Sequence, residues 1–141
     1  MVGRKLKRYQ DYKSRLKFYA RAVNIKITYI TAEDESAYLP TQRKICLERD
    51  LPESVEIAVL LHELGHSLDD ALVNKTTMNE INAAYHAVYS DKANKIHKYT
   101  VIETEKRAWQ FGKVIARICR IPIGNWYYKA KRSCLRAYTK D

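Results

Sequence analysis

Two histidines and a glutamate in the run His62-Glu63-Leu64-Gly65-His66 have the residue types and the spacing of a metal site. Residues four apart on an α-helix share one face and lie about 6 Å apart, so both imidazoles can reach one ion. Glu63 is turned about 100° further round such a helix, toward a water on the ion rather than toward the ion itself. The run therefore predicts a zinc site in which His62 and His66 bind the metal and Glu63 takes a proton from the water.

The residues around this run have the pattern of an amphipathic helix. On a helical wheel with His62 at zero, His66 falls near ~40°. The apolar residues fall between about 160° and 280°, and they are Ile57, Leu60, Leu61, Leu64, Leu68, Ala71 and Leu72. A histidine of the core would lie among the leucines, whereas these two lie opposite them. The helix is predicted over residues 50–72, with Asp50 as its cap and Pro52 in its first turn.

A zinc site of this kind needs a third protein ligand, and the two aspartates that follow are unsuited to that role. Asp70 lies about 12 Å along the helix axis from His62. Asp69 is better placed to hold the outer nitrogen of a ligating histidine by a hydrogen bond. His86 and His97 fall on the polar side of the next predicted helix and are expected at the surface.

Two glutamates later in the chain, Glu103 and Glu105, remain as candidates for the third ligand. The wheel separates them, because Glu103 falls beside polar residues and is expected to face water. Glu105 shares its face with small or apolar residues, namely Ala108, Trp109, Gly112, Ala116 and Cys119. A carboxylate on a buried face needs a charge partner, and a metal ion is the natural one. Glu105 is therefore predicted as the third ligand.

These side chains must be positioned by a chain of 141 residues, which suits one compact domain spanning residues 1–141. Residues at helical spacing predict amphipathic helices, and runs rich in β-branched residues predict strands. The predicted helices cover about 5–23, 50–72, a segment from Thr77, 101–120 and 126–141, and the predicted strands cover 25–31, 37–39 and 44–48. We predict an α+β fold in which a short antiparallel sheet packs on the histidine-bearing helix and a later helix delivers Glu105.

Cysteine usage and hydropathy bear on the compartment. The three cysteines, Cys46, Cys119 and Cys134, are odd in number and widely spaced, which favours free thiols in a reducing cytosol over a disulfide framework or a cysteine-zinc site. No apolar run approaches 18 residues, and no apolar stretch follows the charged N-terminus. The sequence therefore predicts a cytoplasmic protein with neither a signal peptide nor a membrane span.

The net charge of +10 is unevenly distributed. Residues 1–26 hold nine Lys/Arg and one acid, residues 106–141 hold ten and one, and the segment between them holds seven against fourteen. Basic ends could contact nucleic acid or an acidic partner, although solvated helix faces are the simpler explanation. The alternative function is a basic nucleic-acid- or protein-binding regulator that keeps a metal site for structure. Its support is the aromatic and basic segment Asn125–Arg132.

The metal motif resembles that of a known group of enzymes. The run from His62 to His66, followed about 40 residues later by Glu105-Lys106-Arg107-Ala108, is similar to the HExxH plus ExxA pattern of the gluzincin metallopeptidases. The segment from Tyr38 to Leu47, which precedes an apolar helix, resembles the ImmA/IrrE family, and that resemblance covers about residues 38–112. Members of this family are intracellular metallopeptidases of bacteria, phages and mobile elements, and many act on repressor-like regulators.

The resemblance implies roles for particular residues. His62, His66 and Glu105 would bind zinc, and Glu63 would be the general base for hydrolysis of a protein substrate. An edge strand at about Lys44–Glu48 would take up the substrate as an added strand.

The chain also departs from the family pattern, and other families share parts of it. Trp109 stands where the family tends to have Asn or Asp. The run from His62 to Asp70 also resembles the catalytic domain of anthrax lethal factor-like peptidases. A SprT-type protease would need a third histidine ligand, for which only His86 and His97 remain.

Overall fold

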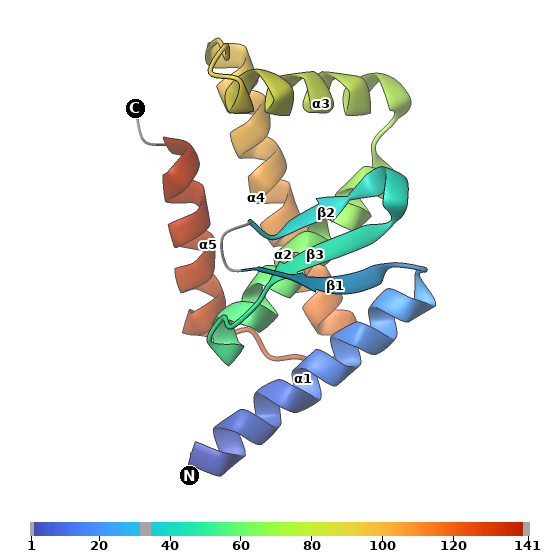
Figure 1. Cartoon of the computed structure of the whole chain (residues 1–141), viewed down its shortest axis with the longest axis vertical. Coiled ribbons are helices and arrows are strands. Elements are labelled where there is room, and N and C mark those ends of the chain that lie inside the picture. The colour runs from blue at the N-terminus through green and yellow to red at the C-terminus, as the bar shows by residue number, and fades with distance from the viewer. Residues whose placement is uncertain (1, 32–34, 140–141) are drawn as a thin grey trace.

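The computed structural model describes the backbone of residues 2–31 and 35–139, and the side chains of these residues from Lys7 onward. This part of the chain is α+β, with five α-helices and a small sheet (Figure 1). In order, the elements are α1 (Val2–Ala22), β1 (Lys26–Ile30), β2 (Ala37–Leu39), the 3-10 turn η1 (Pro40–Gln42), β3 (Lys44–Glu48), α2 (Glu53–Leu72), α3 (Lys75–Tyr89), α4 (Lys95–Ile118) and α5 (Asn125–Thr139). Residues 140 and 141, which end the last predicted helix, lie outside the described residues.

The three strands form a mixed sheet in the order β1-β3-β2. β2 and β3 are joined by η1 and pair antiparallel, whereas β1 runs parallel to β3, with Ile27 opposite Ile45. The predicted antiparallel sheet is therefore wrong for one of its two pairings. The reason is that β3 turns back from β2 and enters the space between β2 and β1, so it runs in the direction of β1.

The same strand order corrects the prediction of an edge strand at Lys44–Glu48. That segment is β3, which is the central strand, and β2 is an edge strand. The alternation of apolar side chains determines which face of a strand is buried but not which strand lies beside it. A partner that added to the sheet near α2 would therefore meet β2 rather than β3.

Helix α2 lies at the centre of the fold, behind the sheet in Figure 1, and packs against α1, α4, α5, β2 and β3. Its predicted apolar face is confirmed from Ile57 to Leu64, because Ile57, Leu60, Leu61 and Leu64 are fully buried. At the end of the helix the prediction is wrong, because Ala71 and Leu72 are exposed there. Side chains from the neighbouring elements complete the core, among them Leu16, Ile45, Leu47, Trp109, Ile115 and Tyr127. Burial of this apolar face fixes the rotation of α2, and the rotation turns the two histidines away from the leucines.

The start of α2 differs from the prediction by three residues. Asp50 adopts a left-handed conformation with φ of 63°, and the helix begins at Glu53 after Pro52, which has φ of −52°. A proline disfavours helical geometry in the residue before it, and Pro52 itself has a non-helical ψ of 143°, so the helix cannot begin before Glu53. Asp50 is therefore part of the turn after β3 and does not cap α2.

Glycine residues let α2 and α4 approach closely beside the histidines. A Cβ atom on Gly65 would lie 1.9 Å from the carbonyl oxygen of Ala108 on α4. A Cβ atom on Gly112 would lie 2.9 Å from the carbonyl oxygen of Leu61 on α2 and 2.5 Å from the hydroxyl of Tyr127. These distances are below van der Waals contact, so only glycine fits at either position without moving the helices apart.

Helices α3 and α4 both begin at asparagine caps. Asn74 accepts a hydrogen bond from the amide of Thr77, and Asn94 accepts one from the amide of His97. His97 Nδ1 in turn accepts from the amide of Asn94, so α4 begins six residues before the predicted residue 101. His97 therefore belongs to the first turn of α4 and not to the preceding helix. Within the described residues, none of the helices is long and apolar enough to cross a membrane.

Candidate metal centre

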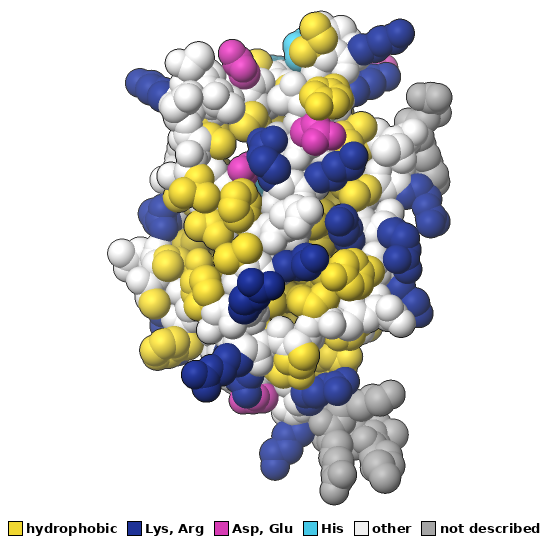
Figure 2. Space-filling model, turned by 180° about the vertical axis from the view of Figure 1, so that it is seen from behind, with side chains coloured by type: hydrophobic (Ala, Val, Ile, Leu, Met, Phe, Trp, Pro, Cys, Tyr) yellow, Lys and Arg dark blue, Asp and Glu magenta, His cyan; other side chains and the backbone are white. Residues whose placement is uncertain are grey.

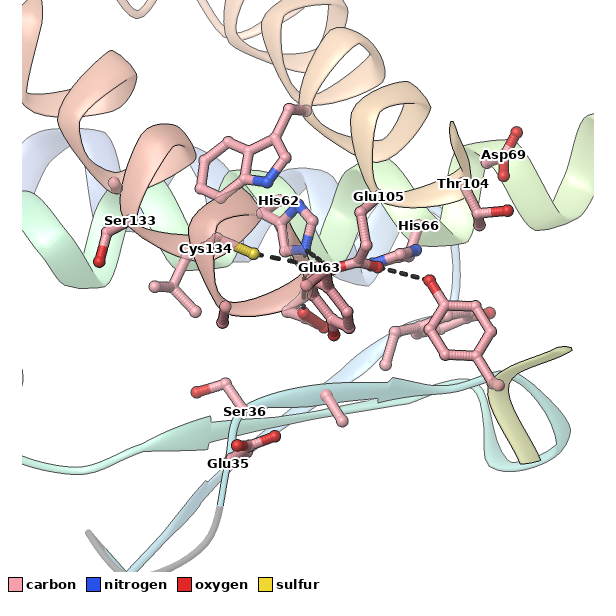
Figure 3. Close-up of a pocket in the computed structure, with 18 of the residues that line it drawn as sticks. Glu35, Ser36, His62, Glu63, His66, Asp69, Thr104, Glu105, Ser133 and Cys134 are labelled. Atoms are coloured by element: carbon pink, nitrogen blue, oxygen red, sulfur yellow. Dashed lines mark hydrogen bonds and ion pairs between the residues drawn. The ribbon is translucent and has the colours of Figure 1, made fainter. Parts of the chain in front are cut away.

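His62 and His66 of α2 meet Glu105 of α4 at a single point (Figure 3). One ligand atom from each of the three side chains lies within 4.8 Å of the others. The Nε2 atom of His62 is 3.2 Å from Glu105 Oε1, and the Nε2 atom of His66 is 2.7 Å from Glu105 Oε2. Two neutral imidazoles and one carboxylate form a donor set that suits zinc, with room for a fourth ligand.

Glu105 reaches the histidines because of its place on α4. Its neighbours on the same helix face, Ala108, Trp109 and Gly112, are buried against α2, and Glu105 itself is only 3% exposed. Glu103 lies on the outer side of α4, where its nearest charged partner is Lys106 at 3.5 Å. The predicted positions are therefore confirmed: Glu105 lies on the buried face of α4, and Glu103 lies on its outer side.

The charges of Glu105 and His66 depend on each other. Burial would raise the pKa of Glu105, but the hydrogen bonds from His62 and His66 outweigh it and lower the pKa below its usual range. Burial would lower the pKa of His66, but the hydrogen bond to Glu105 and the charge of Glu63 raise it. In this structure the Nε2 atoms of His62 and His66 each contact one oxygen of the carboxylate, and a bound cation would lie between the same three groups.

Glu63 lies beside this cluster, and its carboxylate is not among the three ligand atoms. Its Oε1 atom is 3.8 Å from His62 Nε2, and its buried Oε2 atom has no hydrogen-bond partner. Burial raises the pKa of Glu63, which His62, His66 and a hydrogen bond from the backbone of Tyr38 partly offset. A buried carboxylate with a free oxygen and a raised pKa is suited to accept a proton near neutral pH.

Asp69 differs from its predicted role. Both of its carboxylate oxygens are bound by Arg107 of α4, at 3.0 and 3.4 Å, instead of by a histidine nitrogen. Arg107 also donates to the hydroxyl of Thr104, so the ion pair joins α2 to α4 next to the cluster. The cause is the forked guanidinium of Arg107, which matches both oxygens of a carboxylate, whereas a histidine would match one. The outer nitrogen of His62, Nδ1, has no hydrogen-bond partner.

Trp109 holds His62 by a ring contact in place of a hydrogen bond. The two rings are stacked, with their centroids 4.3 Å apart and their planes at 22°. Trp109 is in turn fixed by Tyr127, whose ring meets it edge-on at 5.1 Å and whose hydroxyl donates to the backbone oxygen of Trp109. The position where the ImmA/IrrE family tends to have Asn or Asp thus carries an aromatic ring that restricts the orientation of one candidate ligand.

The cluster lies on the floor of a cleft of about 1220 Å³. One wall is the edge strand β2 with the residues before it, another is α3, and a third is α5 (Figures 1 and 3). The large apolar residues at helical spacing on α3 line this cleft, namely Met78, Ile81, Tyr85, Val88 and Tyr89. Their spacing therefore marks the wall of a cleft, and among them only Ile81 is buried.

Two residues that the sequence did not single out contact Glu105. The hydroxyl of Tyr85 donates to Glu105 Oε2 at 2.5 Å, and the thiol of Cys134 lies 3.7 Å from Glu105 Oε1. Tyr85 follows Ile81 by four residues on α3, and that spacing is the one signal that could have placed it near the site. His86 is exposed and His97 caps α4, so neither joins the cluster.

Comparisons of the chain with models of protein families, with curated proteins and with solved structures found no match.

Proposed function

We propose that the protein is a zinc-dependent metallopeptidase that hydrolyses peptide bonds of a protein substrate. The observation that carries the proposal is the convergence of His62, His66 and Glu105 within 4.8 Å, with the carboxylate of Glu63 beside them. Three protein ligands of the N, N, O type that leave a fourth position open are typical of catalytic zinc, whereas structural zinc usually has four protein ligands.

Three of the side chains would bind zinc, and Glu63 would transfer protons. Zinc bound at such a site lowers the pKa of a water to about 7 and polarises a carbonyl group. Glu63 accepts the proton of the attacking water and delivers it to the amine that leaves, because its carboxylate lies beside the cluster, with Oε1 3.8 Å from His62 Nε2 and Oε2 without a partner. Stacking on Trp109 keeps His62 in the orientation that directs Nε2 toward Glu105.

The size of the cleft supports a polypeptide substrate. At about 1220 Å³ it exceeds the roughly 300–1,000 Å³ of sites for small molecules. The edge strand β2 lines the cleft, so an extended segment could pair with it. The resemblance to the ImmA/IrrE family points to an intracellular, repressor-like regulator as the substrate.

The purified protein is expected to bind one zinc ion per chain and to cleave fluorescently labelled casein, an unfolded test substrate. Removal of the metal with a chelator should abolish cleavage, and added zinc should restore it, because the water is activated only with the metal bound. Metal content is measured by atomic absorption and cleavage by fluorescence. A protein that cleaves equally well without metal, or that binds no zinc, would contradict the proposal.

A second candidate function is favoured by one observation. Between Lys113 and Arg136, α4 and α5 carry six Lys or Arg side chains, and Arg120 in the loop that joins them adds a seventh. No acid occurs among residues 106–139, and none of the seven forms an ion pair in the described part of the chain. Figure 2, the view from behind, shows dark blue side chains spread across this face. Lys113 also lies over the ring of Tyr128, 5.6 Å from its centroid.

This basic face suits the phosphates of a nucleic acid, in which case the metal site would serve structure. A duplex DNA of mixed sequence is then expected to bind with an affinity that falls steeply between about 50 and 200 mM salt. Replacement of Arg117 and Arg132 by glutamine should weaken that binding and reduce the salt dependence. DNA binding without cleavage of any protein would favour this candidate over the peptidase, and no binding at low salt would exclude it.

A further inference from the structure

The carboxylate of Glu105 is surrounded by four side chains from three other helices. Oε1 faces His62 Nε2 at 3.2 Å and the thiol of Cys134 at 3.7 Å. Oε2 faces His66 Nε2 at 2.7 Å and the hydroxyl of Tyr85 at 2.5 Å. Both oxygens are thus satisfied in the structure, although the side chain is almost fully buried.

These four contacts would not all persist in a metal-bound protein. The nitrogens that His62 and His66 direct at the carboxylate are the atoms that would bind the ion, so those two contacts would be given up. The thiol of Cys134 is a weak donor at a long distance. Among the residues that the structure describes, the hydroxyl of Tyr85 is therefore the one strong hydrogen-bond donor that can stay on Glu105.

Tyr85 belongs to α3, a helix that contributes none of the three candidate metal ligands. Helix α3 packs mainly on α4, with Ile81 and Ala84 buried in that contact. Tyr85 follows on the next position of α3 and extends into the cleft to reach Glu105. The phenolic hydroxyl can donate one hydrogen bond, and its short contact with Oε2 of Glu105 uses it.

We propose that Tyr85 is the positioning residue of the zinc site, which holds one oxygen of Glu105 so that the other is directed at the metal. This inference rests on the proposed zinc site and adds to it a residue of α3. A glutamate side chain has three rotatable bonds, and fixing it in advance reduces the entropy lost when it binds a metal. Tyr85 also joins the wall of the cleft to the metal ligands.

The test compares the zinc affinities of Tyr85→Phe and Tyr89→Phe, each measured by competition with a coloured chelator. Tyr89 is the matched control, because it lies one turn further along α3, its ring stacks on that of Tyr85 at 6.2 Å, and it loses the same hydroxyl. We expect zinc binding to weaken by about 10- to 100-fold in Tyr85→Phe and to change by less than about twofold in Tyr89→Phe. The visible spectrum of the cobalt-substituted protein should change in Tyr85→Phe alone, because it reports on the ligands around the metal.

Other outcomes would overturn the inference and would identify the reason. Equal zinc affinities for Tyr85→Phe and wild type, with wild type losing zinc on His62→Ala, would refute the role of Tyr85 and leave the zinc site standing. A wild-type protein that binds no zinc would refute the proposed function and this inference with it. Lower thermal stability of metal-free Tyr85→Phe, with an unchanged zinc affinity, would show that the tyrosine serves folding only. A fall in kcat without a change in zinc affinity would place the hydroxyl on the substrate.

Discussion

Replacing Glu63 with glutamine is expected to leave zinc bound and to remove most of the peptidase activity. Glutamine has the shape of glutamate but cannot accept a proton, and the carboxylate of Glu63 is not one of the three atoms that would bind the metal. Loss of a general base typically costs about 10²- to 10⁴-fold in rate. We therefore expect kcat/KM for labelled casein to fall by at least about 100-fold, with about one zinc ion per chain retained.

The matched control for this variant is Glu103→Gln, the same chemical change on the outer side of α4. Glu103 is partly exposed, and within the described ranges its one ion pair is with Lys106, so its substitution should change neither zinc content nor cleavage. Thermal denaturation of both variants verifies that each is folded. Cleavage by Glu63→Gln at near the wild-type rate would refute the assignment of Glu63 as the base. Loss of zinc from the same variant would show that Glu63 belongs to the ligand set.

Replacing Glu105 with alanine is expected to abolish tight zinc binding. The two histidines would remain on α2, but the anionic ligand from α4 would be gone. In the described part of the chain, no other Asp or Glu forms a three-residue ligand group with His62 and His66. Because loss of a residue that only supports a ligand costs about 10- to 100-fold in metal affinity, loss of the ligand itself should cost more than about 100-fold. The affinity is measured by chelator competition.

Glu103→Ala again provides the comparison, since the two glutamates lie on the same turn of α4. It should bind zinc as the wild type does. Glu105→Asp adds a second test, because it keeps the charge but shortens the side chain by one methylene, and we expect an affinity between those of wild type and Glu105→Ala. Equal loss of zinc in the Glu103 and Glu105 variants, or loss only in the Glu103 variant, would overturn the ligand assignment.

Much of the candidate site could be predicted from periodicity alone. The leucines of α2 and the small residues of α4 each mark a buried face, and the position of a face fixes the direction of the side chains beside it. That argument distinguished Glu105 from Glu103 and placed His62 and His66 opposite the core. The argument succeeds because each residue of a regular helix is rotated by a fixed angle from the one before it. The number of residues between two positions therefore determines the direction of one side chain relative to the other.

The features that were missed depend on which elements become neighbours, and spacing does not contain that information. The parallel pairing of β1 with β3 follows from the order in which strands enter the sheet. Asp69 binds Arg107 and not a histidine nitrogen, because the packing of α4 on α2 brings the guanidinium of Arg107 to 3.0 Å from its carboxylate. The spacing of residues within α2 does not contain this information. Tyr85 and Cys134 reach Glu105 from α3 and α5. The spacing of Tyr85 after Ile81 indicates a shared helix face, but it does not identify Glu105 on α4 as the residue that this face contacts.

The close approach of α2 and α4 limits how this site could be transplanted into another scaffold. Gly65 is one of the two positions between the histidines at which the motif itself allows any residue. The backbone of α4 restricts this position to glycine, because a Cβ atom there would overlap the carbonyl oxygen of Ala108. Gly112 has the same constraint from the other side, against Leu61. The portable unit is therefore a pair of helices with a glycine at each point of contact. Copying the five residues of the motif onto a single helix would carry over the chemistry of two ligands without the spacing that brings the third.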